Sequence, residues 1–306
     1  MSRWTAAEIP PLQGRVAIVT GATGGLGEKA AQELARAGAE TILAGRNAIK
    51  GQAAVAAIRD KFPAAQVGFE AVDLADLASV AEFAQRYSST HQSLDILINN
   101  AGVMALPRRQ TTVDGFEMQF GTNFLGHFAL TARLLPQLRA AAAPRIVNLS
   151  SIAHRTGTID FGDLQGDRFY LPWKAYSQSK LAMLMFALEL QRRSDATGWK
   201  LISLAAHPGW ARTDLFTNGP GTGGFIGFGA MLAAPIFSQS AEDGALPILF
   251  AATSPGAEPG GYYGPNGIGE LKGPPGPARI GPQAKNRATA ARLWESSERL
   301  LGVHFA

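Results

Sequence analysis

Residues 15–27 read Arg-Val-Ala-Ile-Val-Thr-Gly-Ala-Thr-Gly-Gly-Leu-Gly. The β-branched apolar run at the start of this stretch is typical of a strand that is buried on both faces of a sheet. A glycine-rich turn, 21–27, follows directly, and the apolar spacing beyond it predicts a helix that ends at Gly38. A glycine-rich turn alone is compatible with a simple tight turn, but between a strand and a helix it aims backbone amides at an anionic phosphate. The stretch therefore predicts an α/β fold that binds a nucleotide.

The end of the next strand indicates which nucleotide is bound. Residues 41–44 form a second apolar run, which is followed by Gly45, Arg46 and Asn47. An acidic residue at this place, about twenty residues after the glycines, would bind the ribose 2′-hydroxyl of NAD. Arg46 instead carries the planar fork that pairs with a 2′-phosphate, the alternative being a solvated side chain at a strand end. The sequence favours NADP(H) over NAD(H) as the cofactor.

Apolar runs and helical patterns alternate along the rest of the chain. Expected strands cover 66–72, 94–98, 145–149 and 200–206, and expected helices cover 48–61, 77–87, 114–138, 174–189 and 240–252. This regularity predicts a single doubly wound Rossmann-type α/β domain, with a parallel sheet of about seven strands and helices on both faces. The polar motifs fall at the carboxyl ends of strands or on the helices that follow, where such sheets bind ligands.

Composition excludes several classes of function. The chain has 306 residues, a length at which single α/β domains are common, and we expect one domain over 1–306. Its formal net charge of +4 comes without a basic block, so nucleic acid is not an expected partner. The absence of cysteine excludes disulfides and thiol nucleophiles, and the five histidines lack metal-ligand spacing, so no metal is expected.

Targeting and membrane segments are not expected. The N-terminus has no apolar core before Pro10 and Pro11, and no apolar run reaches the roughly eighteen residues of a membrane span. The nearest candidate, 223–237, is rich in glycine and is interrupted by Pro235. We expect a soluble cytoplasmic protein.

Residues 174–189 form the candidate catalytic helix. Tyr176 and Lys180 lie four apart, one turn along the same side of this helix. A phenol beside an ammonium is a plausible acid/base pair, because the positive charge favours the phenolate and lowers a pKa that is otherwise about 10. The alternative is a surface tyrosine with an unrelated lysine, since Tyr-x-x-x-Lys recurs by chance.

Taken in order, these motifs resemble the short-chain dehydrogenase/reductase family. The resemblance extends from residue 15 to about 215 and is carried by Thr20-Gly-Ala-Thr-Gly-Gly-Leu-Gly27, Asp73-Leu74, Asn99-Asn-Ala-Gly102, Asn123, Ser151, Tyr176-x-x-x-Lys180 and Pro208-Gly209. The glycine spacing, Gly-x-x-x-Gly-x-Gly, is not the Gly-x-Gly-x-x-Gly of the usual dinucleotide fingerprint. Val147-Asn-Leu-Ser-Ser-Ile-Ala-His154 and Asp163-Leu-Gln165, within a long serine-to-tyrosine insert, resemble the retinol dehydrogenase-like and protochlorophyllide reductase-like branch.

The resemblance implies a catalytic tetrad of Asn123, Ser151, Tyr176 and Lys180. Tyr176 would exchange a proton with the substrate oxygen while hydride moves to or from the nicotinamide. Lys180 would hold the nicotinamide ribose and lower the tyrosine pKa, and Ser151 would hydrogen-bond the substrate oxygen. Asn123 would hold a water that links Lys180 to solvent, or else act as an amide that stabilises a helix kink. Ser150, next to Ser151, is expected to be structural.

The resemblance also implies a set of cofactor-binding residues. Tyr176 and Lys180 belong to this set, and its other members are Gly21, Thr23, Gly25, Leu26, Gly27, Arg46, Asp73, Leu74, Asn100, Ala101, Gly102, Pro208, Gly209 and Thr213. Asp73 would contact the adenine, and Thr213 the carboxamide. Asn100 and Gly102 would line the adenosine ribose. Asp73 is also placed to cap the next helix, and Asn100 to form a turn.

The segment 210–238 is expected to select the substrate. Its apolar side chains are interspersed with glycines, which suits a lid over a hydrophobic ligand as well as a pair of helices packed on the core. Contact with a membrane surface is an open alternative, although the segment lacks a cationic polar face. His154, Arg155 and Trp173 flank the catalytic stretch, and we expect them to be ordinary packing residues rather than pocket lining. The expected substrate is a lipophilic carbonyl compound or alcohol.

The C-terminal extension, 255–306, has no assigned role. Residues 255–282 are over half glycine and proline, so we expect an irregular surface segment, with Tyr262 and Tyr263 in a final edge strand. Between Ala290 and Leu301 apolar residues recur at helical spacing. That helix is expected to dock on the domain, with a contact between two copies of the chain as the alternative.

These expectations give one main hypothesis, an NADP(H)-dependent short-chain oxidoreductase that moves hydride between nicotinamide and a lipophilic carbonyl compound or alcohol. An alternative from another class is a non-catalytic nucleotide-sensing or interaction protein on the same fold. A regulator has no need to keep the whole tetrad, which disfavours this alternative. An epimerase or dehydratase with tightly held nicotinamide is disfavoured by the short substrate region.

Overall fold

The strands of the protein form one sheet. The computed structural model describes residues 4–210 and 239–305, and in these ranges the strand order is β3-β2-β1-β4-β5-β6-β7-β8. The strands are β1 (Val16–Thr20), β2 (Glu40–Gly45), β3 (Val67–Ala71), β4 (Ile96–Asn99), β5 (Arg145–Leu149), β6 (Ile202–Ala206), β7 (Tyr262–Pro265) and β8 (Pro275–Pro277). All neighbours from β3 to β7 pair in parallel, and β8 is antiparallel to β7. The order 3-2-1-4-5-6 is that of a Rossmann sheet, so the predicted doubly wound α/β fold is confirmed.

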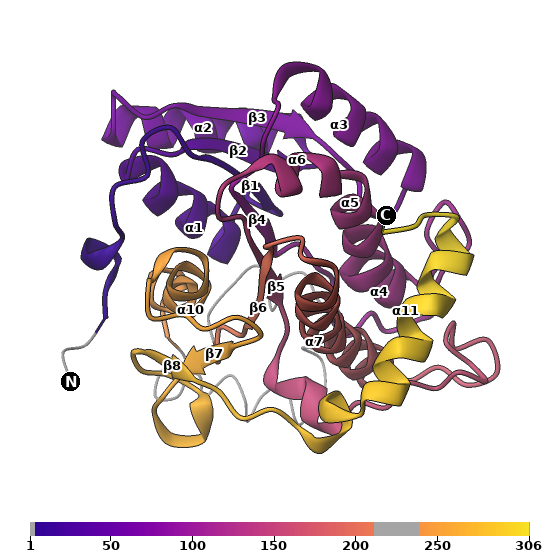
Figure 1. The fold of residues 1–306 in the computed structure, drawn as a ribbon. Coiled ribbons are helices and arrows are strands. Elements are labelled where there is room, and N and C mark those ends of the chain that lie inside the picture. The colour runs from indigo at the N-terminus through magenta and orange to yellow at the C-terminus, as the bar shows by residue number, and fades with distance from the viewer. Residues whose placement is uncertain (1–3, 211–238, 306) are drawn as a thin grey trace.

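Helices cover both faces of this sheet (Figure 1). They are α1 (Gly25–Arg36), α2 (Ala48–Lys61), α3 (Leu77–Thr90), α4 (Met118–Phe120), α5 (Gly126–Arg133), α6 (Leu135–Ala140), α7 (Pro172–Thr197), α10 (Ala241–Thr253) and α11 (Arg287–Leu301). Buried side chains of α1, α2 and α10 share one core, and those of α3, α5, α7 and α11 share the other. Along β1 the side chains alternate between these cores, with Ile18 in one and Ala17 and Val19 in the other. Both faces are covered, which explains why this strand is apolar without alternation.

The expected continuous helix over 114–138 is wrong. Regular helix begins only at Met118, and a π-helical turn, Gly121–Leu125, separates α4 from α5. A second break follows at Leu134, where α6 restarts the helix with a proline in its first turn. Pro136 has no backbone N–H to donate to the preceding turn, so the helical hydrogen bonding is interrupted and α5 ends before it. The π-helical turn holds Asn123 and is therefore part of the candidate site.

The prediction of an irregular surface segment over 255–282 is also wrong in part. Tyr262 and Tyr263 form a strand, as predicted, but the strand is not at the edge, because β8 pairs with its free side. Both tyrosines are buried, with 3% and 5% of their surface exposed. The Tyr262 ring packs edge-on against His154 and tilted against His207. The extension is thus bound to the carboxyl-terminal end of the sheet.

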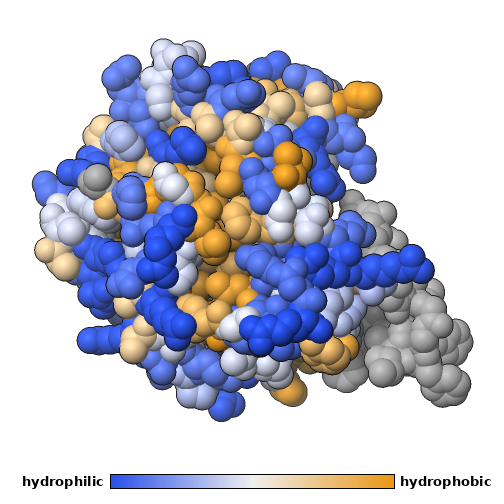
Figure 2. All heavy atoms as spheres, turned by 90° about the vertical axis from the view of Figure 1, so that its right-hand side faces the viewer, coloured by the Kyte–Doolittle hydropathy of each residue, from blue (hydrophilic) through white to orange (hydrophobic). Residues whose placement is uncertain are grey.

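The last helix docks within the chain, as predicted. Leu293 and Trp294 of α11 are buried, and the Trp294 ring lies 5.0 Å from that of Phe128 and 4.4 Å from that of Phe305. On the side of the molecule that carries α11, hydrophilic side chains surround a hollowed band of apolar ones (Figure 2). Within the described ranges no helix has both the length and the apolar character that a membrane span requires.

Candidate active site

A cleft of about 360 Å³ lies at the carboxyl ends of β1, β2, β3, β4 and β5. Eleven of the predicted cofactor-binding residues line it: Gly21, Thr23, Gly25, Leu26, Gly27, Arg46, Asp73, Leu74, Asn100, Ala101 and Gly102. The structure therefore brings together in one cleft residues that follow four different strands, β1 to β4, and lie up to about eighty positions apart. Tyr176, Lys180, Pro208 and Gly209 do not line this cleft, and Thr213, with the rest of 211–238, lies outside the described residues.

The glycine-rich turn is pressed against the loop after β4. A Cβ on Gly21 would lie 2.8 Å from the Ala101 Cα, and one on Gly27 would lie 2.5 Å from the Asn100 Nδ2. Gly21 and Gly25 also have φ values of +65° and +57°, which other residues rarely adopt. The Asn100 side chain donates to the Thr20 carbonyl at 2.7 Å, so it holds the glycine-rich turn in place. The turn leaves its backbone open to the cleft, and a pyrophosphate fits such a cradle.

Cationic side chains border the cleft at the end of β2. Arg46 is exposed and lines the cleft, and it has no hydrogen bond or ion pair with the described residues. Lys50, in the first turn of α2, lines the same wall and was missed in the sequence. Its place in the first turn of the helix that follows β2 is the signal that could have identified Lys50.

Asp73 does not cap the helix that follows it. The cap of α3 is Asp76, whose side chain accepts from the amides of Ala78 and Ser79. The Asp73 Oδ1 accepts from the amide of Ala75 at 2.9 Å, and the residue lines the cleft. The capping alternative for Asp73 is therefore wrong.

The predicted tetrad comes together beside this cleft. Tyr176 and Lys180 lie in the first turns of α7 and are 8% and 5% exposed. The Lys180 Nζ donates to the Leu149 carbonyl at 3.0 Å and lies 5.8 Å from the centre of the Tyr176 ring. A Cβ on Gly102 would lie 3.0 Å from the Asn123 Oδ1 and 3.6 Å from the Lys180 Nζ. Since Gly102 also lines the cleft, the cleft and the tetrad are continuous.

Burial dominates the protonation of the central pair. It raises the pKa of Tyr176 to about 12, although a hydrogen bond with Ser151 acts in the opposite direction. It lowers the pKa of Lys180 to about 8, because the ammonium is desolvated without a carboxylate partner. Burial, and not the Lys180 charge, therefore dominates the pKa of Tyr176 in this arrangement. The ammonium is bonded to the Leu149 carbonyl, and both groups have lost their hydration.

Asn123 stabilises a kink. Its Oδ1 accepts from the Val103 amide at 2.7 Å, and its Nδ2 donates to the Val103 carbonyl and to the Ser179 Oγ, both at 2.9 Å. The carbonyl of Asn123 accepts from the His127 Nδ1 at 2.8 Å, which is the bond available where the helix widens. Burial lowers the pKa of His127 to about 4, so the ring is neutral. The Asn123 side chain thus ties the π-helical turn to Val103 and Ser179, whereas the backbone carbonyl at the kink is bonded by His127.

Ser151 begins the turn after β5. Its hydroxyl accepts from the Ala153 amide at 3.2 Å, and its carbonyl accepts from the His154 Nδ1 at 2.6 Å. The neighbouring Ser150 Oγ donates to the Lys180 carbonyl at 2.8 Å, a structural role as expected. His154 is buried in packing, again as expected, whereas that expectation is wrong for Trp173. The Trp173 ring is 58% exposed and contacts the Tyr176 ring edge-on at 5.8 Å.

Comparison with known proteins gives relatives over nearly the whole chain. A family model described as short chain dehydrogenase matches residues 15–220. Polyprenol dehydrogenase of Mus musculus is 41% identical over 300 residues, which are 96% of this chain and 86% of that protein. Retinol dehydrogenase 12 of Mus musculus is 40% identical over 303 residues, 98% of this chain and 90% of that protein. The crystal structure of an uncharacterized protein from Mycobacterium paratuberculosis is 40% identical, covers 100% of both chains and superposes with a TM-score of 0.81.

Proposed function

The chain belongs to the short-chain dehydrogenase family, in its retinol dehydrogenase-like branch, and we propose that it is an NADP(H)-dependent oxidoreductase of lipophilic alcohols and carbonyl compounds. The observation that carries the proposal is the continuity of the cleft with the tetrad at Gly102. A dinucleotide that lies along the cleft from Arg46 ends beside Tyr176 and Lys180. The bound nicotinamide supplies the hydride chemistry.

The preference for NADP(H) rests on the end of β2. No carboxylate follows β2 in the position that would bind a ribose 2′-hydroxyl, and Arg46 and Lys50 border the cleft instead. An Asp or Glu there would repel a 2′-phosphate, whereas a guanidinium binds it through two parallel hydrogen bonds. The unpaired state of Arg46 among the described residues leaves both donors available.

Tyr176 acts as the proton donor in the reducing direction. With a pKa of about 12 its phenol is protonated at neutral pH and can donate to the substrate oxygen as hydride reaches the carbonyl carbon. Ser151, which hydrogen-bonds Tyr176, is placed to orient the same oxygen. Lys180, with a pKa of about 8, is the nearest charged donor from which the phenolate is reprotonated. The product is an alcohol with the hydride on carbon and the tyrosine proton on oxygen.

The lipophilic substrate is supported by the surface around Tyr176 and by the relatives. Phe169, Leu171 and Trp173, which precede Tyr176, are exposed by 59%, 48% and 58%. Of these, the Trp173 ring contacts Tyr176, and a large exposed apolar side chain beside a reactive group is typical of a binding site. The relatives are named for polyprenol and retinol, both of which are long apolar alcohols.

The test is a panel of apolar aldehydes, ketones and alcohols, including retinal and a polyprenal, followed through NADPH or NADP absorbance. Tyr176→Phe removes only the phenolic oxygen, so turnover should fall by at least about a thousandfold while NADPH binding changes little. Retained turnover in this variant would refute the assigned acid. Cofactor binding without turnover of any panel member by the wild-type protein would favour the non-catalytic alternative.

A further inference from the structure

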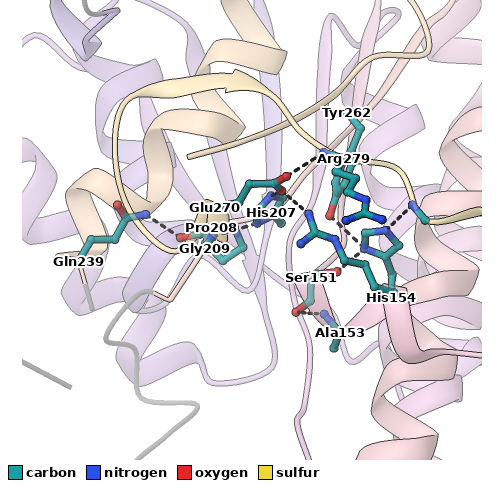
Figure 3. A network of polar contacts seen from close by, with 12 residues as sticks. Ser151, Ala153, His154, His207, Pro208, Gly209, Gln239, Tyr262, Glu270 and Arg279 are labelled. Carbon is teal, nitrogen blue, oxygen red and sulfur yellow. Dashed lines mark hydrogen bonds and ion pairs between the residues drawn. The ribbon is translucent and has the colours of Figure 1, made fainter. Parts of the chain in front are cut away.

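Two buried histidines tie the C-terminal extension to the turns after β5 and β6. His154 lies three residues after Ser151, and His207 follows β6 directly. Both residues are fully buried, and the mechanism proposed above uses neither. Figure 3 shows the His207 ring beside Glu270 and the His154 ring bonded to the backbone of the extension. Each ring makes one hydrogen bond to a turn and one to the extension, so both rings link the extension to the sheet.

The hydrogen bonds fix the tautomer of each ring. The Gly209 amide donates to the His207 Nδ1 at 3.2 Å, so the proton of the neutral ring is on Nε2, which donates to the Glu270 Oε2 at 3.0 Å. The Gly281 amide donates to the His154 Nε2 at 3.1 Å, so Nδ1 carries the proton that is donated to the Ser151 carbonyl. Burial lowers the pKa of both histidines, in agreement with neutral rings.

Glu270 is the centre of this network. Its Oε2 accepts from the Arg155 Nη2 at 2.5 Å as well as from His207, and its Oε1 accepts from the Arg279 amide at 3.0 Å. Although burial acts against ionisation, these bonds and the Arg155 charge lower the pKa of Glu270 to about 2. Glu270 also has a φ of +60°, a conformation that strains a residue other than glycine. Glu270 thus combines a strained backbone conformation with a carboxylate whose two oxygens both accept hydrogen bonds.

The turn after β6 rests directly on the extension. A Cβ on Gly209 would lie 2.3 Å from the Leu271 carbonyl, and the Trp210 amide donates to that carbonyl at 2.8 Å. Gln239 donates to the Pro208 carbonyl at 2.7 Å and accepts from the Gly273 amide at 3.3 Å. The position of Pro208 and Gly209 is therefore set by Gln239 and by residues that lie more than sixty positions further along the chain.

The two turns lie side by side at the end of the cleft away from Arg46. Leu149 of β5, which lines the cleft, pairs with Ala206 of β6, and the Ser150 amide donates to the Ala206 carbonyl at 2.8 Å. We propose that Glu270 is a positioning residue, which holds the Pro208–Gly209 turn and the Ser151 turn in the arrangement that receives the nicotinamide half of the cofactor. The inference rests on the proposed function, because it requires a dinucleotide in this cleft.

The experiment compares the whole cofactor with its adenosine half. Glu270→Gln keeps the size of the side chain but has a single carbonyl oxygen, which cannot serve Arg155, His207 and the Arg279 amide together. We expect the Kd of NADPH, measured by calorimetry, to rise about tenfold or more. The Kd of adenosine 2′,5′-bisphosphate, which reaches only the Arg46 end, should stay within about twofold of wild type. Glu258→Gln, an exposed carboxylate in the same extension, is the matched control and should change neither value.

Equal weakening of both ligands would mean a general loosening of the fold and would overturn the positioning role, as would an unchanged NADPH affinity. Glu270→Gly is the second variant, because glycine accepts the φ of +60° without strain and so should keep the folded state if the glutamine does not. It should show the same selective loss of NADPH. Wild-type protein that binds neither ligand would overturn the proposed function itself, a result distinct from wild-type binding without an effect at Glu270.

Discussion

At the scale of single residues, burial decides the protonation of the acid/base pair. The sequence places Tyr176 and Lys180 on one side of a helix, and this spacing alone predicts a lowered pKa for the tyrosine. The structure instead gives a pKa of about 12 for Tyr176 and about 8 for Lys180, because both groups are desolvated. Spacing could predict that the two residues lie together, but not which carbonyl the ammonium would bond or how much water each would lose.

The first prediction concerns pH. In the reducing direction kcat should fall as pH rises through about 8, because Lys180 then loses the proton that reprotonates Tyr176. Tyr176 does not produce this fall, since its pKa of about 12 keeps it protonated over the whole range. The measurement is kcat with saturating NADPH and substrate from about pH 6 to about pH 10. Lys180→Arg cannot release a proton to the phenolate, so it should have a low kcat without this inflection, and a wild-type profile that is flat to pH 10 would contradict the relay.

The second prediction concerns Arg46. Arg46→Ala should weaken NADPH binding by about ten- to a hundredfold, the range for a lost charge-assisted hydrogen-bond pair, and should leave NADH binding nearly unchanged. Binding of both nucleotides is measured by fluorescence titration. Lys61→Ala, which removes a charge at the other end of α2, is the control for net charge. Equal losses for NADPH and NADH would refute the 2′-phosphate role of Arg46.

At the scale of elements, the apolar spacing of the sequence predicts well those helices and strands that bury one continuous apolar face. The strands β1 to β7 and the helices α1, α2, α3, α10 and α11 lie within a few residues of their expected positions, because each buries a continuous apolar face. Helix α7 begins near its expected start but continues eight residues past its expected end, and β8 was not expected. The π-helical turn at Asn123 was not predictable, since its bonds to Val103 and Ser179 join distant parts of the chain. The burial of Tyr262 in β7 was missed for the same reason, because its packing partners are His154 and His207.

The glycine-rich turn gives a prediction at this scale. Gly27→Ala places a methyl group 2.5 Å from both the Asn100 Nδ2 and the Gly21 carbonyl, so the turn must move away from the loop after β4. Such overpacking costs about 1–3 kcal/mol of unfolding free energy, and dinucleotide affinity should fall at least tenfold. Gly68→Ala is the control, because its Cβ meets nothing within 4 Å and should change neither value. Urea unfolding and NADPH titration measure the two effects, and normal NADPH binding by Gly27→Ala would show that the turn does not contact the cofactor.

At the scale of the whole molecule, the chain closes on itself through its C-terminal extension. β7 and β8 complete the sheet, Glu270 joins the turns after β5 and β6, and α11 packs on α7, which carries Tyr176. Apolar spacing was enough to predict the helix α11 and its docking. The destination of the glycine- and proline-rich residues before it was not predictable, because glycine and proline interrupt the helix and strand periodicity from which burial is inferred.

Substitutions at two tryptophans measure separately how much α11 contributes to the unfolding free energy and how much the surface near Tyr176 contributes to substrate binding. Trp294 of α11 is 2% exposed and lies among Phe128, Phe186 and Phe305, with the Arg193 guanidinium 4.4 Å from its ring centre. Trp294→Ala should therefore lower the unfolding free energy by about 3–5 kcal/mol. No residue of α11 lines the cleft, so KM for the lipophilic substrate should stay close to the wild-type value under conditions where the variant is folded.

Trp173→Ala should have the opposite pair of effects. The side chain is 58% exposed and contributes little to the core, so the unfolding free energy should change by less than about 1 kcal/mol. Its ring faces Tyr176 edge-on, where an apolar chain would replace water, and KM for a long apolar substrate should rise about tenfold. KM for a short carbonyl substrate that does not reach Trp173 should be unchanged. Loss of both substrates alike, or a large loss of stability, would mean that Trp173 supports Tyr176 and does not select the substrate.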